Sequence, residues 1–420
     1  MTGHVRVPGD KSISHRAVMF SAMGDGRSTI RGLNPGDDVS RSARAVTQLG
    51  AHVGDIDSSV VQVEGWGSAP HEPAEIIDAG NSGTTARVLM GLVAGLPGTA
   101  VITGDDSLRN RPMLRVVAPL RSMGATIDGR EHGDRLPVSI RGGALEGREH
   151  TLTIASAQVK TAVLLAGLSA HGRTVVTEPV TSRDHTERML RAAGVTVESS
   201  GTTVAVQGGQ RPTLMEWHVP GDISSAMYLV VAATLRSGST LAIEGVGLNP
   251  TRTGALRVLE AMGASITTDA VDEVCGEPKG DLVIASAELH GTDVPSESIP
   301  SLIDEIPVLA LAASQADGDT TFHGVGELRA KESNRLDAIV DGLRKLGGDA
   351  EAAGDDLIVR GPTPLVGGEV ASGGDHRMAM TFAVAGIISD APIRIHGWSC
   401  VETSFPTFLD VMGEAQGGAR

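Results

Sequence analysis

One short pattern recurs along the whole chain, and this repeat constrains the fold more than any other feature of the sequence. An amphipathic segment ends in a Leu-rich or Met-rich turn followed by Gly, and a strand-like run usually comes next. The glycines recur at intervals of 66 to 84 residues. The six copies end at Gly50, Gly124, Gly194, Gly263, Gly347 and, more weakly, Gly413.

Each copy is typical of a helix that stops at a left-handed glycine and leads into a strand. A single Leu-x-x-x-Gly would only be a common helix ending. Six copies at near-even spacing instead predict six α/β modules of about 70 residues each, which is the signature of an internally repeated architecture.

A second repeat divides the chain into two similar halves. Val7-Pro-Gly-Asp-Lys-Ser12 recurs 212 residues later as Val219-Pro-Gly-Asp-Ile-Ser224, and an apolar helical run follows each copy. We therefore expect two domains of three modules, with the two Pro-Gly-Asp segments as crossings or hinges. Ligand sites favour clefts between domains.

Charge and composition exclude several classes of protein. The net charge is −16 and aromatic residues make up only 2% of the 420 residues, so a nucleic-acid-binding protein is not expected. The sequence shows no signal peptide and no apolar run of membrane-spanning length, which favours the cytoplasm. Cys275 and Cys400 lack the spacing of metal ligands, and we expect neither a metal nor a cofactor.

Polar and cationic residues begin several helices of the first half. Lys11, Ser12 and Arg16 stand at one helix start, where free N–H groups favour an anion. The loop around Asn81 and Gly83 lacks the Gly-Lys-Ser/Thr ending of a nucleotide-binding loop, so it predicts an anion site without ATP. Three further groups extend the pattern: Arg111 before a helix that begins at Pro112, the segment Ser156 to Lys160, and Ser182.

The second half adds carboxylates to the cations. Asp304 stands at the edge of an apolar segment, where a carboxylate is a candidate general base. Lys331 and Arg335 are four residues apart, which predicts one shared helical face, with Glu332 beside them. Each of these patterns also fits a plain capped or salt-bridged surface helix.

The recurrence of the pattern decides between these interpretations. If the module helices run parallel, their positive ends face one cleft. The sequence then predicts a locally positive cleft in an acidic protein, for ligands that carry several negative charges. Its cations would be Lys11, Arg16, Arg111, Lys331, Arg335 and Arg377.

These residues resemble the 5-enolpyruvylshikimate-3-phosphate (EPSP) synthase family, from Pro8 to about Pro406. The shared motifs include Pro-Gly-Asp-Lys-Ser, Gly-Asn-Ser-Gly-Thr, Arg-Pro-Met, Lys-Glu-Ser-Asn-Arg and Asp-His-Arg-Met-Ala. Ala-Ser-Ala-Gln-Val-Lys and Ser-Arg-Asp-His-Thr-Glu resemble the class II bacterial branch.

The resemblance implies an α/β fold of two similar domains, each with three βαβαββ repeats and parallel helices, called an inside-out α/β barrel. One domain would combine residues 1–10 with 222–420, and the other would span 11–221. The crossovers would lie near 8–12 and 219–224. The implied reaction joins phosphoenolpyruvate to the 5-hydroxyl of shikimate 3-phosphate, in the shikimate pathway to chorismate and aromatic amino acids.

The resemblance also assigns roles residue by residue. Asp304 would be the catalytic base, and Glu332, or alternatively Lys11, would protonate the methylene carbon. Shikimate 3-phosphate would be held by Lys11, Ser12, Arg16, Ser156, Ala157, Gln158, Ser182, Asp304, Glu327 and Lys331. Phosphoenolpyruvate would be held by Lys11, Asn81, Gly83, Arg111, Gln158, Arg335, His376 and Arg377.

Three positions depart from the family pattern. Ala157 replaces a serine, so a phosphate contact there must use the backbone, and Glu327 stands where some members have Asn. No Lys occurs near Thr403, where one branch has a cleft lysine. Gly83 is the position at which a larger residue is associated with glyphosate tolerance, so the resemblance implies inhibition by glyphosate. It also implies a monomer.

Three alternative functions follow from the same features. A UDP-N-acetylglucosamine enolpyruvyl transferase shares the fold and chemistry but uses a loop cysteine in its first half, where this chain has none. RNA 3′-phosphate cyclases share the module but need a nucleotide. A non-catalytic anion-binding protein would have no need of Asp304 and Glu332 beside the cations.

Overall fold

The computed structural model describes residues 1–417, which divide into two compact units. Unit 1 contains Met1–Asp10, Pro220–Glu273 and the chain from Pro278 onward. Unit 2 contains Lys11–Val219 and the short segment Val274–Glu277.

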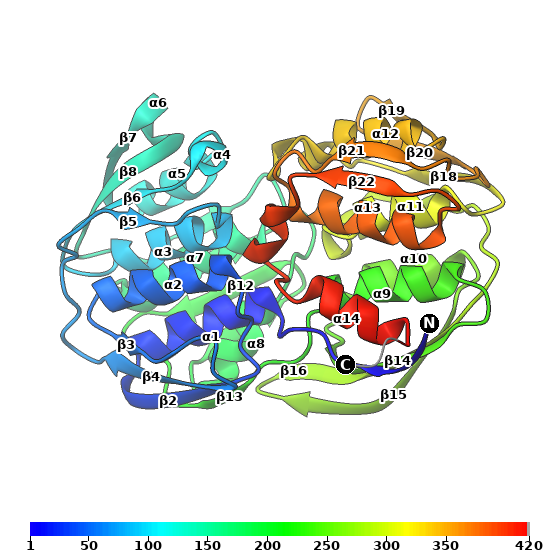
Figure 1. The fold of residues 1–420 in the computed structure, drawn as a ribbon. Coiled ribbons are helices and arrows are strands. Elements are labelled where there is room, and N and C mark those ends of the chain that lie inside the picture. Colours follow the sequence, from blue (N-terminus) through cyan, green and yellow to red (C-terminus); the bar gives the residue numbers. More distant parts are fainter. Residues whose placement is uncertain (418–420) are drawn as a thin grey trace. The chain divides into compact units, whose positions relative to one another are not determined.

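Unit 2 consists of three modules, each with one four-stranded sheet (Figure 1). The first has α1 (Lys11–Met23), β2 (Asp25–Arg31), α2 (Asp37–Gln48), β3 (His52–Val53), β4 (Val60–Trp66) and β13 (Glu216–His218). The second has β5 (Ile77–Asp78), α3 (Gly83–Ala94), β6 (Gly98–Thr103), α4 (Asp106–Arg109), α5 (Leu114–Ser122), β7 (Thr126–Gly129), α6 (Arg130–Gly133) and β8 (Arg135–Gly142). The third has β9 (Glu149–Thr151), α7 (Ala157–Ser169), β10 (Arg173–Thr177), α8 (His185–Ala192), β11 (Val197–Ser200) and β12 (Thr203–Gln207).

Unit 1 repeats this plan with a shorter last module. The first module has β1 (Thr2–Val5), α9 (Ile223–Leu235), β14 (Thr240–Gly247), α10 (Gly254–Ala261), β15 (Ser265–Val274) and β16 (Glu277–Ala285). The second has β17 (Asp293–Val294), η1 (Ser296–Ser301), α11 (Ile306–Ala313), β18 (Gly318–Phe322), η2 (Gly326–Ala330), α12 (Arg335–Lys345), β19 (Asp349–Ala353) and β20 (Asp356–Gly361). The third has β21 (Gly368–Ala371), α13 (His376–Ile388), β22 (Ile393–His396), η3 (Trp398–Thr403) and α14 (Phe408–Ala415), with only a two-stranded sheet among the described residues.

The sheets confirm the βαβαββ plan of the modules. In the order β5-β6-β8-β7, the first pair is parallel and is joined through α3, whereas the other pairs are antiparallel. A helical crossover is what a parallel pair requires. In the first module of each unit the outer strand comes from a distant part of the chain. Thus β13 pairs with β2 and β1 pairs with β14.

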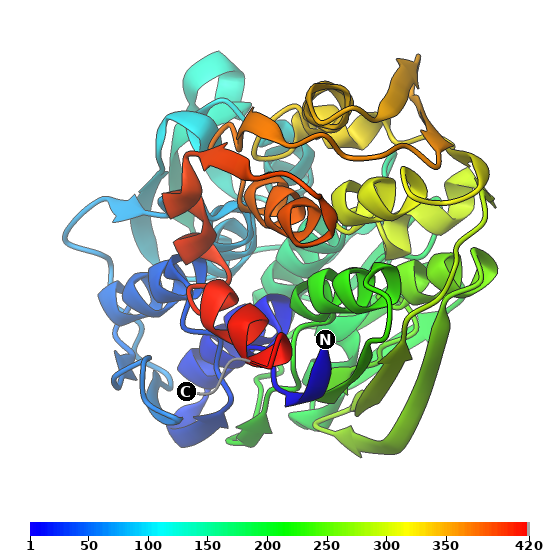
Figure 2. The same cartoon turned by 45° about the vertical axis from the view of Figure 1, so that its right-hand side comes forward.

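Helices fill the centre of each unit and sheets surround them, as the inside-out fold requires. In unit 1, all of α11 is buried, and α9, α11 and α13 contact one another (Figure 2). In unit 2, α3 packs so closely on α7 that a Cβ on Gly91 would lie 2.0 Å from the carbonyl oxygen of Ala162. Among residues 1–417, no helix has both the length and the apolarity to cross a bilayer.

Five of the six repeat glycines follow the prediction. Gly50, Gly124, Gly194, Gly263 and Gly347 have φ between 80° and 113°, and a strand begins two or three residues after each. The prediction for Gly413 is wrong, because it lies inside α14 and the left-handed glycine comes later, at Gly417 with φ 81°.

The two Pro-Gly-Asp segments lie side by side in unit 1. The N–H of Asp10 donates to the carbonyl of Pro220, and the N–H of Asp222 donates to the carbonyl of Pro8, both at 2.8 Å. Gly9 and Gly221 form an antiparallel bridge between them. The chain leaves unit 1 directly after Asp10 and returns at Pro220.

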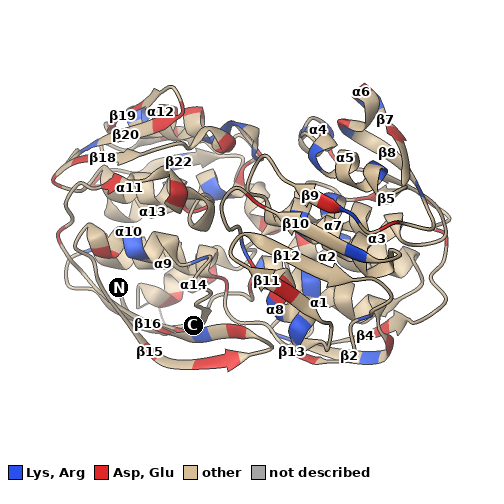
Figure 3. Ribbon diagram, turned by 180° about the vertical axis from the view of Figure 1, so that it is seen from behind, with Lys and Arg blue, Asp and Glu red and all other residues tan. Residues whose placement is uncertain are grey.

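Many of the acidic residues lie on exposed strands. Figure 3 shows Asp and Glu along β15, whose residues Asp269, Asp272 and Glu273 are exposed. This charge stays hydrated and therefore costs the fold little.

Candidate active site

The expected site residues fall into two clusters, one in each unit. Unit 2 holds those at the starts of its helices: Lys11, Ser12, Arg16, Asn81, Gly83, Arg111, Ser156, Ala157, Gln158 and Ser182. Unit 1 holds Asp304, Glu327, Lys331, Glu332, Arg335, His376 and Arg377.

Hydrogen bonds between first and second turns bring the helix starts of unit 2 together. Arg16 of α1 donates to Thr161 of α7 and to Thr186 of α8, each at 2.8 Å. Gln158 of α7 donates to Thr84 of α3 at 3.0 Å. Because only first and second turns take part, these helices present their N-termini at one end of the unit, where N–H groups lack acceptors within their own helix.

Lys11 lies at this end with its charge partly balanced. Its Nζ is 2.9 Å from Oδ2 of Asp38 on α2, and both side chains are largely buried. Asp38 was not among the expected site residues. Arg16 also donates to the backbone carbonyl of Ser12 at 2.8 Å, which fixes its guanidinium over the first turn of α1.

The loop before α3 brings two arginines over a helix start. Arg111 donates to Oδ1 of Asn81 at 2.7 Å, and Arg87 donates to Oε1 of Gln158 at 2.8 Å. A Cβ on Gly83 would lie 2.9 Å from Nη1 of Arg87 and 3.3 Å from Nη1 of Arg111. Glycine is therefore the residue that leaves room for both guanidinium groups.

Two details of this region differ from the sequence interpretation. Helix α5 begins at Leu114, so Pro112 precedes the helix instead of starting it. Arg87 follows the Gly-Asn-Ser-Gly-Thr motif and has no role in the sequence interpretation. It is buried and lies four residues, about one turn, after Gly83 on α3, so the helical spacing indicates that it is a functional candidate.

The start of α7 supplies the remaining polar groups. Ser156 caps the helix, accepting from the Val159 N–H at 3.4 Å. Ala157 is its first residue and offers only backbone, as expected. Ser182 is buried, and within residues 1–417 its hydroxyl has no hydrogen-bond partner in the structure. A hydroxyl left in this state is available to a ligand.

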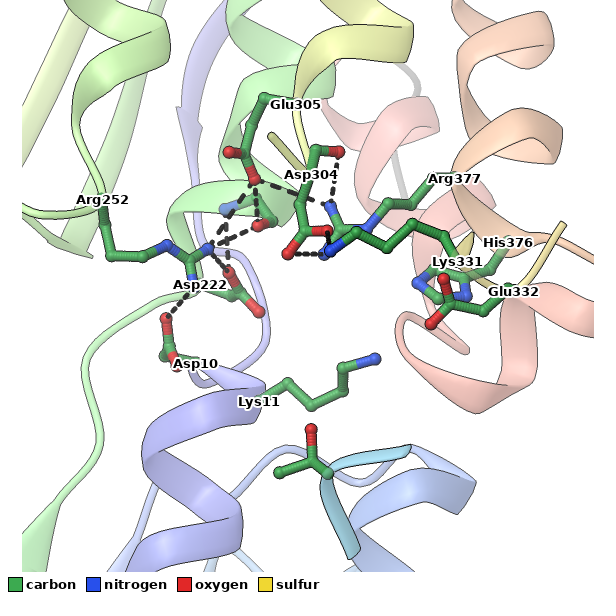
Figure 4. A network of polar contacts seen from close by, with 12 residues as sticks. Asp10, Lys11, Asp222, Arg252, Asp304, Glu305, Lys331, Glu332, His376 and Arg377 are labelled. Carbon is green, nitrogen blue, oxygen red and sulfur yellow. Dashed lines mark hydrogen bonds and ion pairs between the residues drawn. The ribbon is translucent and has the colours of Figure 1, made fainter. Parts of the chain in front are cut away.

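In unit 1, three cations meet one carboxylate. Lys331 lies 3.6 Å from Oδ1 of Asp304, and Arg377 lies 3.6 Å from Oδ2 (Figure 4). Arg335 lies 3.2 Å from Oδ1. Arg377 also donates to the Asp304 carbonyl at 3.1 Å. The segment before α11 thus holds an acid ringed by positive groups that come from two other segments.

Lys331 does not lie on a helix. Helix α12 begins at Arg335 with Asn334 as its cap, so the expected shared helical face of Lys331 and Arg335 is wrong. Asn334 and the preceding turn end the helical geometry, and the two cations meet through Asp304 instead. Glu332 accepts a hydrogen bond from Arg335. Glu327 is half-buried in η2, and His376 starts α13 with Nδ1 3.3 Å from Oγ1 of Thr403.

Buried carboxylates keep the arginines of unit 1 charged. Burial alone would lower the pKa of Arg335, but Asp375, Glu332 and Asp304 together raise it above its ordinary value. For Arg377, burial also lowers the pKa and Asp304 is the largest influence that raises it, so the net direction is again upward. Both guanidinium groups are permanent positive charges with fixed positions.

The structure adds Arg252 to this cluster, a residue that sequence reasoning missed. It is buried and lies 4.0 Å from Asp10, 3.6 Å from Asp222 and 3.8 Å from Glu305. No motif surrounds Arg252 in the sequence. Only the repeated Pro-Gly-Asp segments, which supply Asp10 and Asp222, could have indicated that a cation pairs with these two acids.

The cations of unit 1 are paired with carboxylates. This corrects the expectation of a locally positive region for this unit. The four cations Lys331, Arg335, Arg377 and Arg252 share the carboxylates of Asp10, Asp222, Asp304, Glu305, Glu332 and Asp375. Asp304 and Glu332 are among the expected site residues, whereas Asp10, Asp222, Glu305 and Asp375 have no expected role and are dispersed in the sequence. In unit 2 the helix starts carry several cations and fewer acids.

Each cluster suits a different chemical task. The hydroxyls, N–H groups and arginines of unit 2 suit an oxyanion. The carboxylates of unit 1, fixed by cations, suit proton transfer beside a negatively charged group. Among residues 1–417, no group of three or more His, Cys, Asp or Glu side chains is arranged to hold a metal ion.

Sequence comparisons agree on one family. The family model described as EPSP synthase (3-phosphoshikimate 1-carboxyvinyltransferase) matches residues 1–412. The 3-phosphoshikimate 1-carboxyvinyltransferase of Shouchella clausii is 48% identical over 417 residues, covering 99% of this chain and 97% of that protein. The protein of the same name from Gloeobacter violaceus is 50% identical over 412 residues, covering 98% and 95%.

Solved structures show the same fold. The EPSP synthase from Acinetobacter baumannii superposes with a TM-score of 0.88 at 42% identity, covering 99% of this chain and 95% of that one. The enolpyruvyl transferase NikO from Streptomyces tendae has a TM-score of 0.79 at 18% identity, covering 99% and 94%. At that identity the second likeness concerns the fold alone.

Proposed function

The chain belongs to the EPSP synthase family, and from this premise we propose that it transfers the enolpyruvyl group of phosphoenolpyruvate to the 5-hydroxyl of shikimate 3-phosphate. The products are EPSP and inorganic phosphate, on the route to chorismate and the aromatic amino acids. Both substrates are small and multiply anionic, in keeping with the cations and helix starts of the two clusters.

The substrate contacts in this proposal are those that the resemblance implies. The phosphate and ring of shikimate 3-phosphate are bound by Lys11, Ser12, Arg16, Ser156, Ala157, Gln158, Ser182, Asp304, Glu327 and Lys331. Phosphoenolpyruvate is bound by Lys11, Asn81, Gly83, Arg111, Gln158, Arg335, His376 and Arg377. The contact of Arg111 with Asn81 and the nearness of Gly83 to two guanidinium groups support the second set.

Three proton transfers and the loss of phosphate convert the substrates. Asp304 accepts the proton of the 5-hydroxyl as that oxygen attacks C2 of phosphoenolpyruvate. Glu332, or alternatively Lys11, donates a proton to the methylene carbon, which becomes a methyl group in a tetrahedral ketal phosphate. Phosphate then leaves and the methyl group loses a proton, which restores the double bond. Fixed arginines stabilise the developing negative charge without having to reorganise.

The position of Asp304 among Lys331, Arg335 and Arg377 carries the proposal. The test is phosphate release in the presence of a chelator. We expect release only when both substrates are present, at an unchanged rate with the chelator. Release from phosphoenolpyruvate alone, or a need for added metal, would contradict the proposal.

The proposal includes three further properties: oligomeric state, location in the cell and inhibition by glyphosate. The chain acts as a monomer in the cytoplasm, and glyphosate competes with phosphoenolpyruvate. The space left by Gly83 beside Arg87 and Arg111 supports the third property. Light scattering at micromolar concentration tests the first, fractionation of the producing cell tests the second, and inhibition at varied phosphoenolpyruvate tests the third.

A further inference from the structure

A buried lysine in unit 2 holds two glutamates. Nζ of Lys160 lies 2.8 Å from Oε2 of Glu178 and 2.8 Å from Oε1 of Glu187. All three side chains are at most 3% exposed. Burial would lower the pKa of Lys160, but Glu187 and Glu178 outweigh it and raise the pKa above its ordinary value. The lysine therefore stays charged and fixes both carboxylates.

Glu178 has a second set of partners. Its Oε1 accepts from the N–H of Ser156 at 3.2 Å, and its Oε2 accepts from the N–H of Ser182 at 3.3 Å. Ser156 caps α7, and Ser182 lies three residues before α8. One carboxylate thus ties together the backbone at the starts of two helices, and both tied residues are serines proposed to bind phosphate.

We propose that Glu178 is a positioning residue that sets the affinity for the phosphate group of shikimate 3-phosphate. This inference rests on the proposed function above. By holding two backbone N–H groups on one rigid carboxylate, Glu178 fixes the spacing of the Ser156 and Ser182 hydroxyls. Two hydroxyls at a fixed spacing bind an oxyanion without first losing conformational entropy.

The negative charge of a carboxylate so near a bound phosphate must be neutralised. Lys160 neutralises Glu178 from one side, and the two N–H groups occupy its oxygens on the other. Arg16 contacts Thr161 and Thr186, the residues next to Lys160 and Glu187. The same two helices are therefore also joined through the guanidinium of Arg16.

Glu187 provides a matched comparison inside the same network. It shares the burial of Glu178 and the same lysine. Its hydrogen bonds differ, because within residues 1–417 its Oε2 has no hydrogen-bond partner in the structure. A change at Glu187 disturbs Lys160 without removing an acceptor from either serine N–H.

The test compares Glu178→Gln with Glu187→Gln in the full chain. Each variant is titrated by calorimetry with shikimate 3-phosphate and with shikimate, which lacks the phosphate. A glutamine at 178 places an NH₂ group against donors, so we expect affinity for shikimate 3-phosphate to fall about tenfold or more. Affinity for shikimate should not change, and Glu187→Gln should match the wild type for both ligands.

Several outcomes would overturn the inference. These are equal losses in the two variants, an equal loss for shikimate, or no loss in a folded Glu178→Gln. If Glu178→Gln does not fold, Glu178→Asp keeps the charge with a shorter reach, and it must still lose affinity for shikimate 3-phosphate selectively. A wild-type chain that neither binds shikimate 3-phosphate nor releases phosphate would instead refute the proposed function.

Discussion

The guanidinium of Arg335 is held by the carboxylate of Asp375, with Nε 2.7 Å from Oδ2 and both side chains almost completely buried. The same carboxylate accepts from the N–H of Arg377 at 2.9 Å and from Oγ of Ser333 at 3.1 Å. Asp375 therefore caps α13 and positions a cation at the same time. Stability and the proposed binding of phosphoenolpyruvate therefore depend on the same oxygens.

Asp375→Ala should lower the free energy of unfolding of the chain by about 3–5 kcal/mol, because it leaves Arg335 buried without the buried carboxylate that holds its Nε. Chemical denaturation measures this change. Asp410→Ala is the control, since Asp410 is an exposed acid in the same unit and should change stability by less than about 0.5 kcal/mol. Equal effects of the two changes would contradict the structural role of Asp375.

Asp304→Asn should lower kcat about 100-fold or more, because the amide keeps the size of the side chain but cannot accept the hydroxyl proton. Affinity for shikimate 3-phosphate should stay within about tenfold of wild type, because a polar group remains. Phosphate release and calorimetry measure the two quantities. Glu297→Gln, an exposed change near the start of the same module, should leave both unaltered. Full activity of Asp304→Asn would remove Asp304 as the base.

Gly83→Ala should raise KM for phosphoenolpyruvate and weaken inhibition by glyphosate. The added Cβ would press on Nη1 of Arg87 at 2.9 Å and on Nη1 of Arg111 at 3.3 Å, so both guanidinium groups must shift. Even a small displacement of a bidentate contact costs about tenfold in affinity. Gly143→Ala is the matched control, because a Cβ there meets nothing within 4 Å. A lower KM in Gly83→Ala would contradict the steric argument.

His323 should make unit 1 more stable in mild acid. Hydrogen bonds to Asp356 and then Asp293 raise the pKa of His323 above its ordinary value in the folded chain. Its stabilising contribution is therefore complete below about pH 6.5, the ordinary histidine value, and is lost as the pH rises through the folded pKa. The melting temperature of His323→Gln should fall below wild type at pH 6 and approach it at pH 8.5. A constant difference would contradict this linkage.

The architecture could be predicted from the sequence because helix endings are local. At Gly124 and Gly263 one left-handed residue decides where a helix stops, and the following residues show the strand. The prediction for Gly413 failed because its spacing matches that of the other copies, whereas the residues after it continue the helix. The pairing of β1 with β14 depends on residues more than 230 positions apart, and no local signal reports it.

The candidate site was less accessible to sequence reasoning. Cations at helix starts, such as Lys11 and Arg377, lie where capping patterns indicate them. Glu178 and Arg252 stand in no recognisable pattern, and only three-dimensional packing shows that one holds two serine N–H groups and the other lies near three acids. Charge compensation of this kind depends on distances, which sequence separation does not give.

The position of β1 in the sequence determines when this strand can pair during synthesis. Thr2–Val5 leaves the ribosome well before its neighbour β14, which starts at Thr240. At about 5–20 residues per second, the strand waits on the order of ten seconds or more for this partner. Residues 11–219 of unit 2, including its late strand β13, are complete before then. The nascent chain thus carries an unpaired strand edge ahead of a largely assembled unit, and a chaperone that shields such edges would act on β1.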